Sequence, residues 1–112
     1  SESQKYSEVR VMKRAKKISL RYENKIIRLD GELPNEKLLM LLLKKKVLAK
    51  ADAIKYLYHR PYDSEFDDEV IRREMEKVRK RLQKLGIPTT AVVFDKKGYR
   101  FLPPVCMMKE TH

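Results

Sequence analysis

Residues 70–82 read Val70-Ile71-Arg72-Arg73-Glu74-Met75-Glu76-Lys77-Val78-Arg79-Lys80-Arg81-Leu82, and this stretch carries two patterns at once. Apolar residues recur at spacings of four, three, four and three, through Ile71, Met75, Val78, Leu82 and Leu85. This period predicts a helix with one buried stripe. At about 100° per residue, a row of cations falls on the opposite face: Arg73, Lys77, Lys80 and Lys84. We therefore predict a helix over 69–85, ended by Gly86 and Pro88, with one side in a core and cations on the other.

The segment just before this helix reverses the charge of the chain. Residues 61–69 read Pro-Tyr-Asp-Ser-Glu-Phe-Asp-Asp-Glu, with five acids and no base. Asp67 or Asp68 can cap the helix that follows. The rest of the segment predicts an exposed loop, which is either simply solvated or contacts a basic partner. The residues of this candidate contact are Tyr62, Asp63, Glu65, Phe66 and Asp67.

A β-hairpin is predicted over 89–102, directly after the helix. The run 90–94 leads into Asp95-Lys96-Lys97-Gly98, in which Asp and Gly are typical turn residues. Two lysines at the tip, Lys96 and Lys97, suit contacts with phosphates or with a minor groove. The alternative is that they only keep an edge strand from pairing with another chain. Their position just past a basic helix favours the functional interpretation.

Two further helices are predicted ahead of the acidic segment, so that residues 34–85 form a three-helix core. Pro34 suits a first helical turn. Residues 38–43 are apolar at every position, which predicts a helix buried nearly all round. The lysines at 44–46 either complement the C-terminus of this helix or bind an anion. A shorter helix is predicted over 51–58.

Residues 5–32 alternate between apolar and polar side chains, a pattern typical of strands. Glu23-Asn24 lies between two such runs and predicts a tight hairpin in which the asparagine adopts a positive φ. We expect a small antiparallel sheet whose lysines and arginines face the solvent. Residues 103–112 are predicted to be a C-terminal tail, which is either a packed end or a partner contact. Together these elements predict one α+β domain over 1–112.

The charge balance favours a polyanionic partner. The chain has 112 residues, with 27 Lys and Arg against 16 Asp and Glu, a formal net charge of +11. Such a field attracts nucleic acid or an anionic membrane surface. A membrane-surface helix is disfavoured because the chain has no Trp and the core needs the apolar face of the basic helix. No apolar run approaches the roughly 18 residues that span a bilayer. We therefore expect double-stranded DNA as partner, no membrane contact and a cytoplasmic location.

Side chains for catalysis or metal binding are few. His59 and His112 are the only histidines, and Cys106 is the only cysteine. This count excludes a cysteine-based zinc site, a disulfide framework and a histidine-based triad. The three glycines lie too far apart in the sequence for a phosphate-binding loop. We expect no enzyme, no metal, no cofactor and no small-molecule substrate.

Two blocks of the sequence resemble the OmpR/PhoB-type effector domain of bacterial response regulators. Residues 70–82 are similar to the family pattern T-V-D-V-H-I-S-R-L-R-K-K-L, and Gly98-Tyr99-Arg100-Phe101 matches its G-Y-R-F. The likeness spans about residues 8–103. It implies a winged helix-turn-helix with an N-terminal antiparallel sheet, three helices and the 89–102 hairpin as the wing. It also implies transcription regulation as the output domain of a two-component system, with the receiver domain outside this sequence.

The resemblance also implies roles for individual residues. By position, Lys77 reaches base edges in the major groove, Arg73 and Glu74 lie beside it, and the wing tip 95–98 meets the minor groove or the backbone. Segment 61–69 corresponds to a contact with RNA polymerase. A second copy on tandem half-sites is expected, because one such module reads few base pairs. The full set of expected DNA contacts is Arg72, Arg73, Glu74, Lys77, Lys80, Arg81, Lys84, Lys96 and Lys97.

A second function stays open from the sequence. Ahead of G-Y-R-F the family has V-R-G-x, with an arginine that enters the minor groove. This chain has Lys96 or Lys97 there instead. The ammonium of lysine is a compact point charge, whereas the guanidinium of arginine is planar and donates from several nitrogens. The helix also carries acids at Glu74 and Glu76. These features suit a winged helix used for protein interaction in a larger signalling protein, with weak or no DNA binding.

Overall fold

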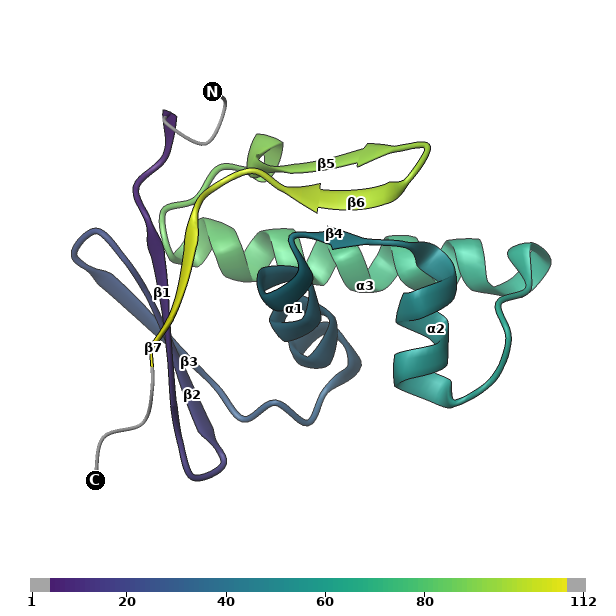
Figure 1. The fold of residues 1–112 in the computed structure, drawn as a ribbon, viewed down its shortest axis with the longest axis horizontal. Coiled ribbons are helices and arrows are strands. Elements are labelled where there is room, and N and C mark those ends of the chain that lie inside the picture. Colours follow the sequence, from purple (N-terminus) through teal and green to yellow (C-terminus); the bar gives the residue numbers. More distant parts are fainter. Residues whose placement is uncertain (1–4, 109–112) are drawn as a thin grey trace.

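The chain forms an α+β fold with three helices and two sheets in its described part, residues 5–108 of the computed structural model (Figure 1). In chain order the elements are β1 (Val9–Arg14), β2 (Lys17–Tyr22), β3 (Lys25–Leu29), α1 (Pro34–Lys45), β4 (Val47–Leu48), α2 (Lys50–Tyr58), α3 (Ser64–Lys84), β5 (Val92–Asp95), β6 (Gly98–Phe101) and β7 (Val105–Met108). A 3₁₀ turn, Thr89–Ala91, joins α3 to β5. The predicted α+β class is confirmed.

The first sheet has the strand order β3-β2-β1-β7. Its three N-terminal strands are antiparallel, as predicted. β7 pairs parallel to β1, from Val9 opposite Val105 to Met12 opposite Met108, and the amide of Val9 donates to the carbonyl of Pro104 at 2.8 Å. Residues 105–108 of the predicted tail therefore form a strand, which agrees with the packed-end alternative, and the sheet is mixed rather than antiparallel. The remaining predicted tail residues, 109–112, lie outside the described part.

The turn between β2 and β3 differs from the prediction in one detail. Glu23 adopts a positive φ of 54°, and Asn24 does not have a positive φ. In a two-residue hairpin turn the first central position takes the left-handed conformation, and here that position is Glu23.

The second sheet has the order β4-β6-β5. β5 and β6 form the predicted hairpin with a two-residue turn, because Asp95 lies opposite Gly98. β4 was not predicted: it has two residues, and Leu48 pairs with Tyr99 on β6. This pairing fixes the start of α2 against the tip of the β5–β6 hairpin.

Helix α1 crosses α3, packs against it and also contacts β7 of the first sheet (Figure 1). It buries Leu38, Leu39, Leu42 and Leu43 in a core shared by both sheets and all three helices. The apolar stripe of α3 is also buried as predicted, at Ile71, Met75, Val78 and Leu82. No helix within residues 5–108 combines the length and apolar character needed to cross a membrane.

Helix α3 begins five residues earlier than predicted, within the acidic segment. Asp63 is its N-cap, and its carboxylate accepts a hydrogen bond from the amide of Glu65 at 3.0 Å. The capping role expected for Asp67 or Asp68 is therefore wrong, and residues 64–68 are helical rather than a loop. Acids in the first turns complement the positive end of the helix dipole, so this composition is compatible with a helix start.

Candidate nucleic-acid interface

The exposed face of α3 carries the predicted row of cations. Arg73, Lys77, Lys80 and Lys84 are all exposed, while the opposite side of the helix packs on α1 and α2. The row spans three turns, or about 16 Å at 1.5 Å rise per residue. It is therefore an uncovered and continuous surface within the described part of the chain.

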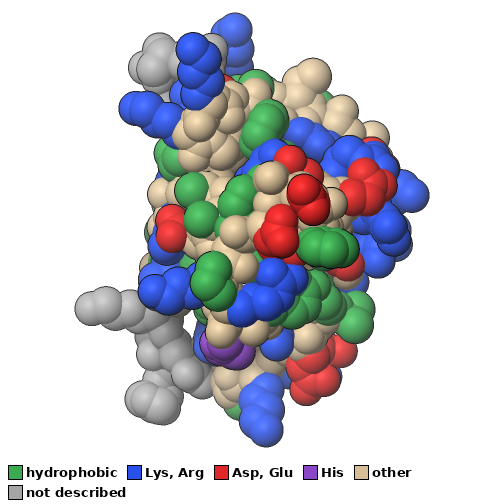
Figure 2. Space-filling model, turned by 90° about the vertical axis from the view of Figure 1, so that its right-hand side faces the viewer, with side chains coloured by type: hydrophobic (Ala, Val, Ile, Leu, Met, Phe, Trp, Pro, Cys, Tyr) green, Lys and Arg blue, Asp and Glu red, His purple; other side chains and the backbone are tan. Residues whose placement is uncertain are grey.

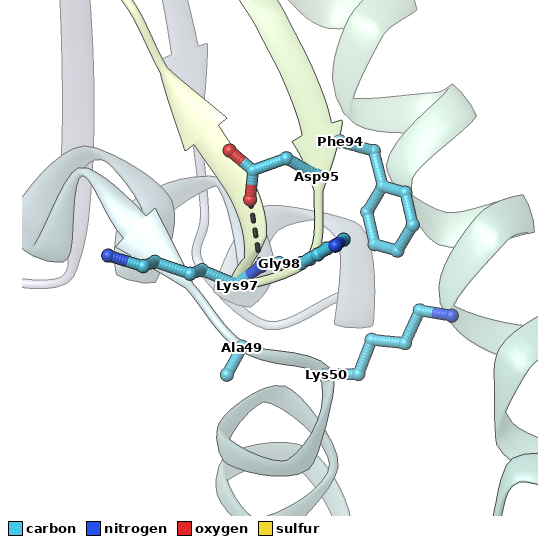
Figure 3. Close-up of a pocket in the computed structure, with 7 residues that line it drawn as sticks. Ala49, Lys50, Phe94, Asp95, Lys97 and Gly98 are labelled. Atoms are coloured by element: carbon cyan, nitrogen blue, oxygen red, sulfur yellow. Dashed lines mark hydrogen bonds between the residues drawn. The ribbon is translucent and has the colours of Figure 1, made fainter.

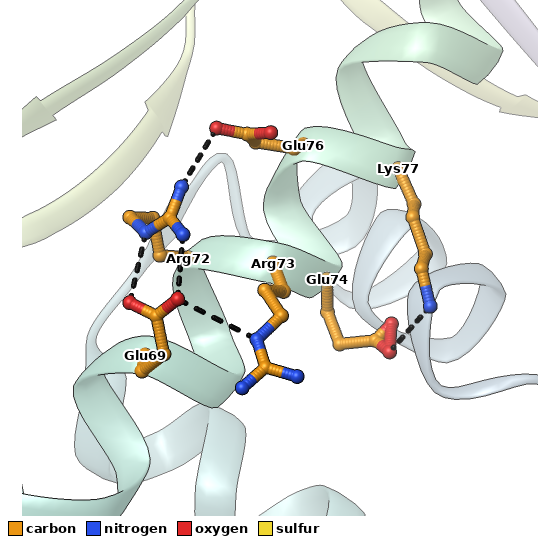
Figure 4. A network of polar contacts seen from close by, with 6 residues as sticks. All are labelled: Glu69, Arg72, Arg73, Glu74, Glu76 and Lys77. Atoms are coloured by element: carbon orange, nitrogen blue, oxygen red, sulfur yellow. Dashed lines mark hydrogen bonds and ion pairs between the residues drawn. The ribbon is translucent and has the colours of Figure 1, made fainter.

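Several cations of this face are held by acids of the same helix (Figure 4). Arg72 pairs with Glu69 at 2.5 Å and with Glu76 at 2.9 Å, and Arg73 lies 3.5 Å from Glu69. The hydrogen bond from Arg72 lowers the pKa of Glu69. These pairs are solvent-exposed, and such pairs contribute about 0–1 kcal/mol each. They align the side chains, and breaking them costs little free energy.

Glu74 is placed differently from the expected base contact. Its side chain is only 13% exposed, and one carboxylate oxygen lies 3.3 Å from the ammonium of Lys77. The other oxygen is buried and has no hydrogen-bond partner in the described part of the chain. Glu74 thus lies beside the cation row and orients Lys77.

Arg81 belongs to the packing of the domain rather than to the exposed row. Its Nε donates to Oδ1 of Asn35 at 2.6 Å, and its guanidinium lies 3.9 Å from Glu36, at the start of α1. Burial raises the pKa of Glu36, but backbone amides, including those of Leu33 and Asp30, and the charge of Arg81 outweigh it, so that this pKa is lowered. With its guanidinium held in this way, Arg81 helps to pack α3 against α1, and the DNA contact expected for it stays a prediction. Arg79, by donating to the carbonyl of Val92 at 3.1 Å, ties α3 to β5 in the same way.

A hollow of about 370 Å³ lies between the hairpin tip and the start of α2 (Figure 3). Its lining residues are Ala49, Lys50, Phe94, Asp95, Lys96, Lys97 and Gly98. The N-cap of α2, Ala49, offers no side-chain hydrogen bond, so the first backbone amides of α2 have no cap. Uncapped amides at a helix N-terminus favour anions. With three lysines around it, the hollow has the chemistry of a phosphate site.

The hairpin tip is held close to α2 by Gly98. This residue has a φ of +123°, and a Cβ placed on it would lie 2.8 Å from the Cα of Ala49 and closer still to the carbonyl oxygen of Leu48. The carboxylate of Asp95 accepts from the amide of Lys97 at 2.8 Å and closes the turn. Lys96 and Lys97 are thereby exposed at the tip, as predicted.

Lys50 is a candidate residue for anion binding at this hollow that the sequence did not reveal. Its ammonium lies 3.0 Å from Asp68 on α3 and 4.8 Å from the ring centre of Phe94 on β5. It therefore connects α2, α3 and the hairpin at the hollow. Lys50 lies just before the helix predicted over 51–58, and no local pattern could reveal it, because its contacts join segments far apart in the sequence.

The predicted partner-contact residues separate into buried and exposed groups. Asp67 is fully buried, and both of its oxygens accept from Arg60, at 2.7 and 2.9 Å. The hydroxyl of Tyr62 donates to Asp68, which raises the pKa of Tyr62 to about 12. Phe66, in contrast, is 69% exposed, and Glu65 beside it is exposed too. At this end of the molecule acidic and hydrophobic side chains gather in the middle of the surface with basic ones around them (Figure 2).

Within residues 5–108, no group of three or more His, Cys, Asp or Glu side chains is arranged to hold a metal ion. Comparison with protein-family models, with curated proteins and with solved structures finds no match to this chain.

Proposed function

We propose that the chain binds double-stranded DNA through α3 and the β5–β6 hairpin, as a winged helix-turn-helix output domain of a bacterial transcription regulator. In this proposal α3 lies in the major groove, and the hairpin is the wing, whose tip meets the minor groove or the backbone. The observation that carries the proposal is the exposed row of Arg73, Lys77, Lys80 and Lys84 on α3.

The hollow at the wing tip supports this proposal independently of the row. A helix in the major groove needs backbone contacts beside it to fix its register on the duplex. Lys50, Lys96 and Lys97 surround the uncapped start of α2 next to α3. A phosphate in this hollow would accept from backbone amides and be neutralised by lysine, which is the chemistry of DNA-backbone contacts.

Charge neutralisation at the exposed row tests the proposal. The variant Arg73→Gln/Lys77→Gln/Lys80→Gln, called the helix variant, removes three cations from α3. The control Lys44→Gln/Lys45→Gln/Lys55→Gln removes three exposed lysines from the ends of α1 and α2. Binding to a random-sequence duplex of two helical turns is followed by fluorescence anisotropy over a series of salt concentrations. Each lost phosphate contact lowers the slope of log K against log salt by about 0.9.

We expect the helix variant to lose affinity and salt slope, and the control to keep most of both. Equal losses in the two variants would mean that only net charge matters, and would contradict a specific role of α3.

A second candidate function is protein binding through the start of α3. Phe66 is the most exposed large hydrophobic side chain of the described residues and lies among acids. Exposed aromatic residues of this kind anchor protein interfaces. The segment corresponds to the contact with RNA polymerase that the sequence resemblance implies. Phe66→Ser should then reduce co-elution with bacterial RNA polymerase on promoter DNA and leave duplex affinity unchanged. Unchanged co-elution would exclude this contact.

A further inference from the structure

The outer face of the β3-β2-β1-β7 sheet carries a dense group of cations that the proposed function does not use. Val9, Val11, Ile18 and Leu20 point into the core, so the alternate residues of the strands point outward. Register places five cations on this outer face: Arg10, Arg14, Lys17, Arg21 and Arg28. Residues 9–29 together hold eight Lys and Arg and one acid, Glu23.

Four of the five cations of this face lie directly opposite another cation. Arg10 pairs in register with Arg21, and Arg14 with Lys17. Like charges at directly opposite positions of an antiparallel pair are destabilising. Only two of the five have acidic partners in the described part of the chain: Glu8 lies 3.6 Å from Arg10, and Asp30 lies 3.2 Å from Lys17. The cations of this face therefore repel one another, and the negative charges of a bound polyanion would reduce this repulsion.

The outer face is also hollowed and accessible. A depression of about 650 Å³ is lined by Met12, Arg14, Lys17, Ser19, Arg28 and Asp30. Because α1 and the end of α3 lie on the inner side of the sheet, the outer side points away from the helices (Figure 1). A straight duplex bound along α3 therefore leaves this face uncovered.

We propose that the outer face of the sheet binds the phosphate backbone of a second DNA duplex, so that one chain can bridge two duplexes. The charge pattern favours DNA over an acidic protein, because the centres of protein interfaces are depleted of charge whereas a one-sign basic face is typical of phosphate contacts. Base-edge contacts are not required for such binding, which comes from the neutralised phosphates. The binding of phosphates by the sheet face does not depend on α3, whereas the bridging of two duplexes rests on the proposed function of α3 as the first DNA site.

The test uses the variant Arg10→Gln/Arg21→Gln/Arg28→Gln, called the sheet variant. All three side chains are exposed, and the substitutions remove the Arg10–Arg21 repulsion, so we expect thermal unfolding at or above the wild-type temperature. The same random-sequence duplex and anisotropy assay are applied to the wild type, the sheet variant, the helix variant, the combined variant and the α1/α2 lysine control.

We expect the helix variant to retain salt-dependent duplex binding, and the combined variant to lose it, with a slope lower by about 0.9 for each phosphate contact removed. If the helix and combined variants bind the duplex equally, or if the helix variant does not bind even at low salt, the proposal is overturned. If only the sheet substitutions reduce binding, the function proposed for α3 and the bridging of two duplexes both fail, and the binding of phosphates by the sheet face stands. The two failures are therefore distinguishable.

Bridging is measured directly with one duplex immobilised on beads and a second, fluorescent duplex in solution. Wild-type chain should retain the fluorescent duplex on the beads. The sheet variant should bind the immobilised duplex and no longer retain the second one, while the control variant bridges like the wild type. Undiminished bridging by the sheet variant would contradict the proposal.

Discussion

At the scale of single residues, Gly98 couples two elements that must meet for the proposed interface to exist. It places the tip of the β5–β6 hairpin against the last residue of β4 and the start of α2, with the Cα of Ala49 2.8 Å from the position of a Cβ. The G-Y-R-F block that carries the family resemblance begins at this residue. In this structure its glycine is therefore explained by packing as well as by its φ of +123°.

Gly98→Ala is expected to destabilise the domain and displace the hairpin. The added methyl group clashes with backbone atoms, and the positive φ is unfavourable for alanine. We expect a loss of about 1–3 kcal/mol in the free energy of unfolding, measured by urea denaturation. Duplex affinity should also fall, because Lys96 and Lys97 move away from Lys50. Wild-type stability in this variant would show that the hairpin is not held against α2.

At the scale of elements, the start of α3 is organised around a buried acid. The hydrogen bonds from Arg60 and from the amide of Asp63 lower the pKa of Asp67, and they outweigh its burial. An acid with a lowered pKa in the folded state stabilises the fold above its unfolded pKa of about 3.9. This stabilisation is lost as the pH falls from there through the folded pKa.

The melting temperature should therefore fall steeply once the pH drops below about 4. Asp67→Asn should melt at a lower temperature than the wild type at neutral pH, and should show a shallower fall in acid. Asp67→Asn should still lose some stability in acid, because the pKa values of three other acids are lowered too: Glu36, Asp68 and Glu69. Glu65→Gln, at an exposed position, is the control. Identical acid dependence of Asp67→Asn and the wild type would contradict this account.

Patterns with a short period were predictable from the sequence, and contacts between distant segments were not. The 3.6-residue period correctly predicted which residues of α3 are buried and which of its cations are exposed. The burial of Asp67 was missed because it depends on Arg60, which lies in the loop before the helix. Arg81 has the same charge as its neighbours on α3, and only its contact with Asn35 on α1 separates it from the exposed row.

At the scale of the whole molecule, β7 returns the end of the described chain to the sheet in which it began. A parallel partner for β1 cannot be read from the local pattern of 105–108, which is short and follows two prolines. The pairing covers one edge of β1, and Val105 packs against the core. β7 thereby links the hairpin directly to the first sheet.

Removing β7 should weaken the entire domain. A chain ending at Pro104 loses the parallel ladder and the burial of Val105, and we expect a loss of about 1–3 kcal/mol in the free energy of unfolding. Urea denaturation of this chain and of a control ending at Met108 gives the comparison. Equal midpoints would mean that β7 does not contribute to stability.

The central claim is that α3 and the β5–β6 hairpin form one DNA interface, and lysine footprinting tests it most directly. The chain is acetylated with and without a duplex of two helical turns, and the modification of each lysine is quantified by mass spectrometry. We predict protection of Lys77, Lys80, Lys84, Lys96 and Lys97 by the duplex, with Lys45 and Lys55 reacting as in the free chain. If the lysines of α3 and the hairpin stay as reactive with DNA as without it, the claim is wrong.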